Sequence, residues 1–153
     1  MAKAIVPFPE VCTGCRLCEM ACSLKHENVL NVEKSRIRVT KEGVRLDVPI
    51  VCTQGNACEQ ECAEVCPVDC IKVVEGSAIE VVEEDCTGCE ACVDACPFAC
   101  IWMKNEVAVK CDLCHGDPTC VKFCPQQAIL YLEGSEEGRE EKWKEAKALV
   151  GGD

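Results

Sequence analysis

Cysteine dominates the chemistry that this chain could perform, because 18 of its 153 residues are Cys. The most regular run covers residues 86–97 and spaces its thiols as C-x2-C-x2-C-x3-C-P. Three thiolates stepped in this way along a tight loop can bind three irons of one cubane, while the fourth points to a neighbouring cluster. Gly88 would let backbone N–H groups approach the cluster sulfurs, and Pro97 would turn the chain after the last ligand.

A zinc site is the main alternative for a cysteine run. Structural zinc is usually held by two separated C-x2-C pairs that close one tetrahedron. The run at 86–97 has one thiol too many for that geometry. Iron–sulfur binding is therefore favoured over a zinc-structured interaction module or a metal store, and brown visible absorption would separate the two.

Composition and charge narrow the function classes. A formal net charge of −11 disfavours nucleic acid as a partner and instead suits solubility or steering toward a basic docking face. The sequence contains no secretory signal and no run of 18 apolar residues, so we expect a cytoplasmic protein without a membrane span. Aromatic residues make up only 4% of the chain, so bound metal should supply much of the folding free energy.

Three further cysteine motifs repeat this run, and in chain order the first to fourth motifs cover residues 12–22, 52–67, 86–97 and 111–125. Residues 12–22 share the C-T-G-C opening but lack the following Pro, and residues 111–125 read C-x2-C-x5-C-x3-C-P. Residues 52–67 are the least regular, with Gly55 at the position where a ligand is expected. Four cysteines nevertheless remain available in that motif.

A shorter repeat separates ligands from other cysteines. The segments 66–71, 96–101 and 124–129 align as C-P-x-x-C-I, C-P-x-x-C-I and C-P-x-x-A-I. Cys70 and Cys100 occupy the slot of Ala128, so we predict that they are buried packing residues and not ligands. The other sixteen cysteines are the predicted ligands, four for each of four [4Fe–4S] clusters: Cys12, Cys15, Cys18, Cys22, Cys52, Cys58, Cys62, Cys66, Cys86, Cys89, Cys92, Cys96, Cys111, Cys114, Cys120 and Cys124.

Short strands are expected between the motifs. Alternating patterns predict a strand within residues 1–11, a hairpin over 36–48 around Glu42 and Gly43, and a closing strand over 128–132. Two further hairpins are predicted over 71–82, turning at 75–77, and over 101–109, turning at 104–106.

The tail from 133 to 153 changes composition abruptly. It is predicted to form a helix with an acidic start and a basic end. Trp143, Ala146, Leu149 and Val150 share one face of that helix, which we expect to dock on a partner or on a second copy of the chain.

No other residues suggest catalysis. His26 follows a complete set of four cysteines and is expected to be a hydrogen-bonding surface residue, while Trp102 and Tyr131 are expected in the core. The sequence shows no open metal position, no dinucleotide loop after a strand and no nucleophile elbow. We therefore expect an electron-transfer protein and not an enzyme.

With these motifs, the chain resembles the four-cluster ferredoxin-like electron-transfer subunits of molybdenum or tungsten enzymes, and of some hydrogenases and carbon monoxide dehydrogenases. The resemblance covers roughly residues 5–132. The opening C-T-G-C-R-L-C-E-M-A-C-S-L-K-H and the segment 35–39 are most similar to the small subunits of tungsten aldehyde oxidoreductase-type complexes. The second motif departs from the more usual C-x2-C-x4-C-x3-C-P spacing.

This resemblance implies an α+β fold of two pseudo-symmetric bacterial-ferredoxin-like units over residues 1–132, with short hairpins, cluster-binding loops and a C-terminal helix in 133–153. Motifs one and four would form one unit, and motifs two and three the other. The implied ligand sets are Cys12, Cys15, Cys18 and Cys124; Cys111, Cys114, Cys120 and Cys22; Cys52, Cys58, Cys62 and Cys96; and Cys86, Cys89, Cys92 and Cys66.

The implied function is conduction of single electrons along four [4Fe–4S] clusters in an anaerobic oxidoreductase complex. The partners would be a catalytic subunit, with a tungsten or molybdenum cofactor favoured, and an external electron carrier or further redox subunit. The alternatives are a free soluble polyferredoxin carrier and an electron-transfer subunit of a hydrogenase or carbon monoxide dehydrogenase. Self-association through the tail is a further possibility.

Overall fold

The computed structural model describes residues 3–44, 46–73, 78–133 and 139–150. Within these ranges the strands form antiparallel two-stranded sheets. The strand pairs are β1 (Lys3–Pro7) with β8 (Ile129–Glu133), β2 (Arg38–Glu42) with β3 (Leu46–Ile50), β4 (Ile71–Lys72) with β5 (Glu80–Val81), and β6 (Trp102–Lys104) with β7 (Val107–Val109).

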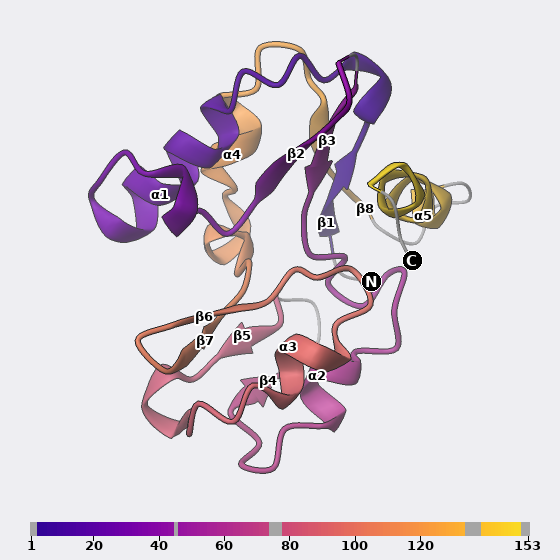
Figure 1. Cartoon of the computed structure of the whole chain (residues 1–153). Coiled ribbons are helices and arrows are strands. Elements are labelled where there is room, and N and C mark those ends of the chain that lie inside the picture. Colours follow the sequence, from indigo (N-terminus) through magenta and orange to yellow (C-terminus); the bar gives the residue numbers. More distant parts are fainter. Residues whose placement is uncertain (1–2, 45, 74–77, 134–138, 151–153) are drawn as a thin grey trace.

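Short helices alternate with these sheets (Figure 1). The α-helices are α1 (Leu17–Glu27), α2 (Glu61–Glu64), α3 (Ala91–Ala95), α4 (Thr119–Lys122) and α5 (Arg139–Leu149). The 3-10 turns are η1 (Pro9–Val11), η2 (Val32–Lys34), η3 (Glu83–Asp85) and η4 (Leu113–Gly116). No helix in the described part of the chain is long and apolar enough to cross a membrane.

The hairpins predicted from the sequence are confirmed, with small shifts at the turns. The β6–β7 hairpin turns at Asn105 and Glu106, which both have positive φ (50° and 63°), as a two-residue hairpin turn with right-handed strand twist requires. The predicted turn at 75–77 lies outside the described residues. β8 pairs with β1, so the predicted first and closing strands lie side by side.

The elements gather into two groups around the cysteine motifs (Figure 1). In one group α1 packs on α4, next to the β1–β8 and β2–β3 sheets, and in the other α2 packs on α3, next to the β4–β5 and β6–β7 sheets. Ile5, Ile37 and Ile129 lie in the core of the first group, and Ile71 and Ile101 in the core of the second. This arrangement is the predicted α+β, ferredoxin-like fold.

Helix α5 packs on its own chain, which corrects the prediction that its apolar face docks on a partner. The side chains of Trp143 and Ala146 are buried, and Trp143 packs in one cluster with Ala4 and Val6 of β1. The indole N–H of Trp143 donates a hydrogen bond to the carbonyl oxygen of Ile5 at 3.2 Å. The face of β1 that α5 covers would otherwise be exposed, so the helix completes the core of this chain.

Candidate iron–sulfur sites

Three cavities in the structure are each lined by four of the predicted ligand cysteines. Each of these cavities takes three cysteines from one motif and the fourth from another. The three sets are Cys12, Cys15, Cys18 and Cys124; Cys52, Cys58, Cys62 and Cys96; and Cys86, Cys89, Cys92 and Cys66. We call them the first, third and fourth thiol sets. The fold thus brings together residues that lie up to about a hundred positions apart.

The four remaining predicted ligands gather around Cys120 and form the second thiol set. Burial raises the pKa of the Cys120 thiol, and the nearby thiols of Cys111, Cys22 and Cys114 raise it further. The thiol of Cys22 likewise interacts with that of Cys114. A buried neutral thiol binds metal by releasing its proton, and four such sulfur ligands suit a soft or borderline metal such as iron in an iron–sulfur cluster.

Interactions between sets arrange them in a series. Cys120 of the second set lies close to Cys18 of the first, and Cys111 of the second set lies close to Cys52 of the third, within one core cluster. Cys96 of the third set packs against the core cluster that contains Cys66 and Cys92 of the fourth. The order in space is therefore first, second, third and fourth.

Only the two ends of this series present exposed ligand cysteines within the described residues. Cys15 of the first set and Cys89 of the fourth are exposed, whereas the other predicted ligands are buried or half-buried. The inner sets are thereby shielded from water, and each end has a thiol-bearing loop at the surface.

The loops that carry the first two cysteines of a motif depend on left-handed backbone. Gly88 has φ +71°, and a Cβ added there would lie 2.6 Å from the carbonyl oxygen of Glu106. Arg16, Gln60 and Glu90, each two residues before the third cysteine of its motif, also have positive φ. Turns of this kind aim successive N–H groups into a concavity that accepts anions.

A backbone N–H group donates a hydrogen bond to the fourth cysteine of every motif. The donors follow Cys66, Cys96 and Cys124 by four residues in the C-P-x-x repeats. The bonds run from Cys70 N to Cys66 Sγ (3.4 Å), from Cys100 N to Cys96 Sγ (3.3 Å), from Ala128 N to Cys124 Sγ (3.2 Å) and from Arg36 N to Cys22 Sγ (3.2 Å).

The first motif obtains this bond in a different way, which explains its missing proline. Helix α1 continues beyond Cys22 to Glu27, so the chain does not turn directly after the fourth cysteine. Arg36, 14 residues later, supplies the N–H instead. A proline after Cys22 would interrupt α1.

Cys70 and Cys100 are both buried, as the C-P-x-x repeat predicted, and each is 3% exposed. Cys70 Sγ is 3.4 Å from Cys66 Sγ, and Cys100 Sγ lies 3.3 Å from the carbonyl oxygen of Phe98. A hydrogen bond from Cys100 lowers the pKa of Cys96 to about 6, in spite of burial. Their assignment as packing residues stays a prediction.

His26 is half-buried and not a surface residue, which corrects the prediction made from the sequence. Its Nε2 lies 3.4 Å from Asp112 Oδ1 and 3.6 Å from Cys114 Sγ, and Arg36 also binds the Asp112 carboxylate at 2.8 Å. Burial lowers the pKa of His26. Because His26 and Cys114 are 88 residues apart, no local pattern could have paired them.

Lys110 is a buried cation that the sequence interpretation missed. It is 3% exposed, and its Nζ donates to the carbonyl oxygens of Ile79 at 2.7 Å and Cys111 at 3.4 Å. Burial alone lowers the pKa of Lys110, but interactions with Cys52, Cys111 and Cys62 outweigh that effect and raise it overall. The ammonium group therefore stays charged between the second and third thiol sets. The one feature of the sequence that could have pointed to Lys110 is its position directly before a motif cysteine.

Comparison with known proteins matches these sites to a family. Two models described as "4Fe-4S binding domain" match residues 9–25 and 79–102, which contain the whole of the first and third motifs. The polyferredoxin-like subunit of aliphatic sulfonate oxidoreductase from Pyrococcus furiosus is 42% identical over 124 residues, which cover 78% of this chain and 70% of that protein. The chain belongs to the 4Fe–4S ferredoxin family.

A second curated relative and a solved structure also match most of the chain. The electron transport protein HydN of Escherichia coli is 31% identical to this ferredoxin over 161 residues, covering 87% of the chain and 89% of HydN. Among solved structures, a chain of the active site complex BamBC of benzoyl coenzyme A reductase has 23% identity and a TM-score of 0.49, covering 97% of this chain and 90% of that one. The family models and the two curated relatives together identify this ferredoxin as an iron–sulfur electron-transfer protein.

The thiol sets of this ferredoxin fit [4Fe–4S] clusters by their chemistry. Thiolates are the usual ligands of such clusters, and a cluster with four thiolates is an anion that suits the left-handed N–H loops. The N–H bonds to Cys22, Cys66, Cys96 and Cys124 are of the type that tunes cluster sulfurs.

Proposed function

We propose that this ferredoxin holds four [4Fe–4S] clusters, one on each thiol set, and that it is the electron-transfer subunit of an oxidoreductase complex. The observation that carries this proposal is the serial order of four thiol sets with an exposed cysteine at each end. When bound, the clusters would supply one-electron redox chemistry between the two ends. Cys15 and Cys89 mark the surfaces for the two partners.

We further propose that one partner is a catalytic subunit with a tungsten or molybdenum cofactor, as in tungsten aldehyde oxidoreductase-type complexes, and that the other is an electron carrier. The motif resemblance supports the first assignment. A relative named as a subunit of an oxidoreductase supports a fixed position in a complex. The proposed compartment is the reducing cytoplasm of an anaerobic cell, where thiols persist unpaired.

The residues around the thiol sets would shield the clusters from water and adjust their reduction potentials. Burial of Cys62 and Cys120 excludes water from the inner sets, and backbone N–H groups at the fourth cysteines stabilise negative charge on sulfur. No member of a thiol set is left over to bind a substrate. The proposed subunit therefore has no catalysis of its own.

The proposal predicts that the purified, fully loaded ferredoxin will not turn over aldehydes, formate, carbon monoxide or hydrogen with a viologen acceptor. Its visible absorption should bleach on reduction with dithionite and return when an oxidised viologen is added, because electrons pass through it without a chemical product. Turnover of any of these substrates by the single chain would contradict the proposed role. Recovery of the native protein as a free monomer would favour a mobile carrier.

Replacing Cys70 and Cys100 together by Ala is predicted to leave cluster content unchanged, because Ala128 fills the equivalent place in the third repeat. Anaerobic analysis should find about sixteen iron atoms and about sixteen sulfides per chain in both proteins, as four cubanes require. The matched control is Cys66→Ala beside Cys70, which should lose about four of each. Equal losses in the double variant would show that a ligand has been misassigned.

A further inference from the structure

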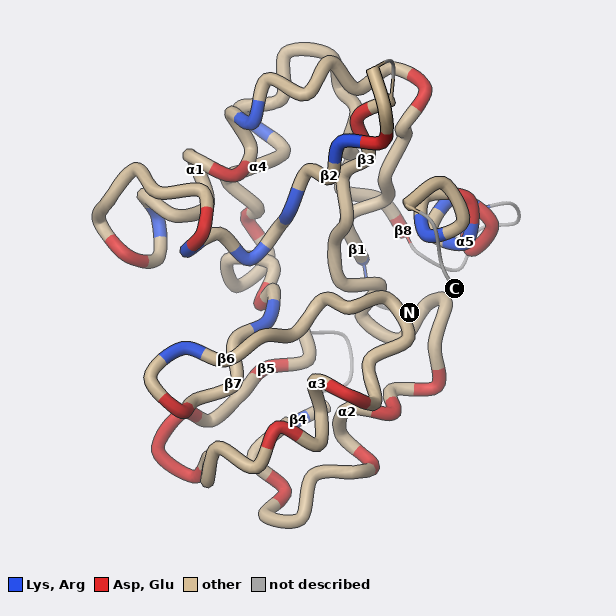
Figure 2. Tube along the Cα trace, viewed as in Figure 1, with Lys and Arg blue, Asp and Glu red and all other residues tan. Residues whose placement is uncertain are grey.

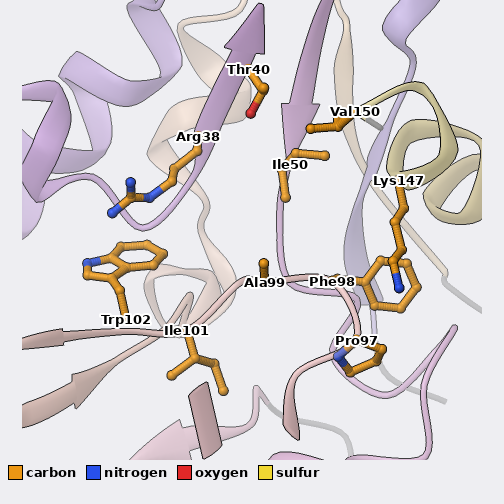
Figure 3. Close-up of a pocket in the computed structure, with 10 residues that line it drawn as sticks. All are labelled: Arg38, Thr40, Ile50, Pro97, Phe98, Ala99, Ile101, Trp102, Lys147 and Val150. Atoms are coloured by element: carbon orange, nitrogen blue, oxygen red, sulfur yellow. The ribbon is translucent and has the colours of Figure 1, made fainter. Parts of the chain in front are cut away.

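A groove of about 450 Å³ opens between β2, helix α5 and the segment that follows Cys96 (Figure 3). We call it the Trp102 groove. Arg38 and Trp102 lie at one end and Lys147 and Phe98 at the other, with Ile50 and Ile101 among the apolar side chains that line it (Figure 3). The sequence interpretation placed Trp102 in the core, whereas its half-buried ring forms part of this groove.

Each end of the groove holds a cation over an aromatic ring. The Arg38 guanidinium lies 4.4 Å from the centroid of the Trp102 ring, and Lys147 Nζ lies 5.6 Å from that of Phe98. Such stacking keeps long cationic side chains in place at an exposed site. Tryptophan and arginine are also the residue types most enriched where protein interfaces gain their affinity.

Neither cation is neutralised within the described residues. No Asp or Glu lines the groove, and no described carboxylate lies within 4 Å of Arg38 or Lys147. Glu19 does interact with Arg38 at longer range, but its Oε1 accepts the N–H of Val39 at 3.0 Å. The positive charge of the groove is therefore available to an outside partner.

The lining of this groove differs in charge from a chain that is strongly acidic overall. The formal net charge is −11, and Figure 2 shows acidic segments over α2 and α3, Lys and Arg on β2, and charges of both signs on α5. A second copy of the chain would carry the same net negative charge. Repulsion between the two copies therefore opposes self-association through this groove. A partner that presents carboxylates at the groove is favoured by charge.

We propose that the Trp102 groove seats an extended segment of the catalytic partner that carries two acidic side chains flanking an apolar one. The acidic groups would pair with Arg38 and Lys147, and the apolar side chain would pack on Ile50 and on the exposed Ala99. This inference rests on the proposed function and deepens it. Pro97 lines the groove directly after Cys96 of the third set, so the segment would anchor the partner beside an inner set without itself covering the exposed cysteine at either end.

The first test is site-specific photocrosslinking in the native complex. Thr40 lines the groove on β2, so Thr40→p-benzoylphenylalanine in the full-length chain places the probe there, and the same replacement at Lys25, exposed on α1, is the control. The expected product joins position 40 to a peptide of the companion chain with two acidic residues around an apolar one. A crosslink to a second copy, or to a peptide without acidic residues, overturns the proposal.

The crosslinking experiment also separates this inference from the proposed function. A companion that co-purifies without a crosslink at position 40 overturns the groove assignment alone. If no companion chain co-purifies at all, both the groove assignment and the proposed function are contradicted.

The second test reverses the charge of the groove. Arg38→Glu with Lys147→Glu should lower the recovery of companion about tenfold or more, because carboxylates would face carboxylates. Lys25→Glu with Lys72→Glu makes the same change in net charge at exposed sites that line no part of the groove, and should have little effect. Arg38→Gln with Lys147→Gln, at unchanged iron content, should give a smaller loss. Equal losses in the groove and control pairs would overturn the proposal.

Discussion

Removal of iron and sulfide from the full-length chain is expected to abolish its cooperative unfolding transition. Apart from the thiol sets, the described helices and strands are too short to stay folded without bound metal. β4 and β5 have two residues each, α2 and α4 have four each, and every sheet in the described residues has two strands. Isolated hairpins and helices this short are marginal in water.

The cores themselves consist largely of the groups that metal would bind. Cys18, Cys22, Cys52, Cys111 and Cys120 belong to one core cluster, and three more predicted ligands belong to the other. Without metal these thiols meet as small apolar groups around cavities, and an unfilled cavity loses packing energy. Metal binding would therefore supply folding free energy directly.

Anaerobic circular dichroism during thermal unfolding tests this expectation. The loaded protein should show one cooperative transition, and the chelator-treated protein should show a weak, non-cooperative signal. Reconstitution with iron and sulfide should restore the transition, which controls for damage during chelation. An apo chain that unfolds cooperatively at the same midpoint would show that apolar packing alone holds the fold.

The sequence predicted the local structure well because cysteine spacing constrains it. The C-P-x-x repeat places an N–H group four residues after the fourth cysteine, and the hairpins occupy the intervals between motifs. The left-handed turns at Gly88 and Glu90 follow from the same spacing, since loops that carry closely stepped ligands must curve tightly.

Contacts between distant segments could not be predicted in this way. Two of the four residues predicted for the apolar face of α5, Trp143 and Ala146, are buried, but a helical pattern does not specify whether β1 or another protein covers them. The grouping of His26 with Asp112 and Cys114 depends on how α1 packs near the fourth motif. The Trp102 groove likewise forms only when β2, α5 and the segment after Cys96 meet.

Replacing Lys110 by Met is expected to lower the reduction potential of one or both inner clusters. Adding an electron makes a cluster more negative, so a nearby ammonium group stabilises the reduced form. Lys110 is buried between the second and third thiol sets, where screening by water and salt is weak. We expect the reduction equilibrium to fall about tenfold or more, which is ~59 mV for one electron.

Lys110→Met removes the charge but retains an unbranched side chain of similar length. The carbonyl oxygens of Ile79 and Cys111 would lose their donor, at an expected stability cost of about 1–3 kcal/mol. Lys110→Arg keeps the charge and should restore the potential. Lys72→Met, which removes an exposed lysine on β4, should leave every potential unchanged.

Redox titration monitored by electron paramagnetic resonance, at unchanged iron content, measures these potentials. The expected pattern is a negative shift confined to one or two of the four proposed clusters in Lys110→Met and near-parental values in Lys110→Arg. Equal shifts in both variants would assign the effect to altered packing. Unchanged potentials in Lys110→Met would mean that the carbonyl oxygens and solvent screen the ammonium charge from the inner sets. The comparison therefore distinguishes a residue that sets the potential of the electron path from one that only fills its core.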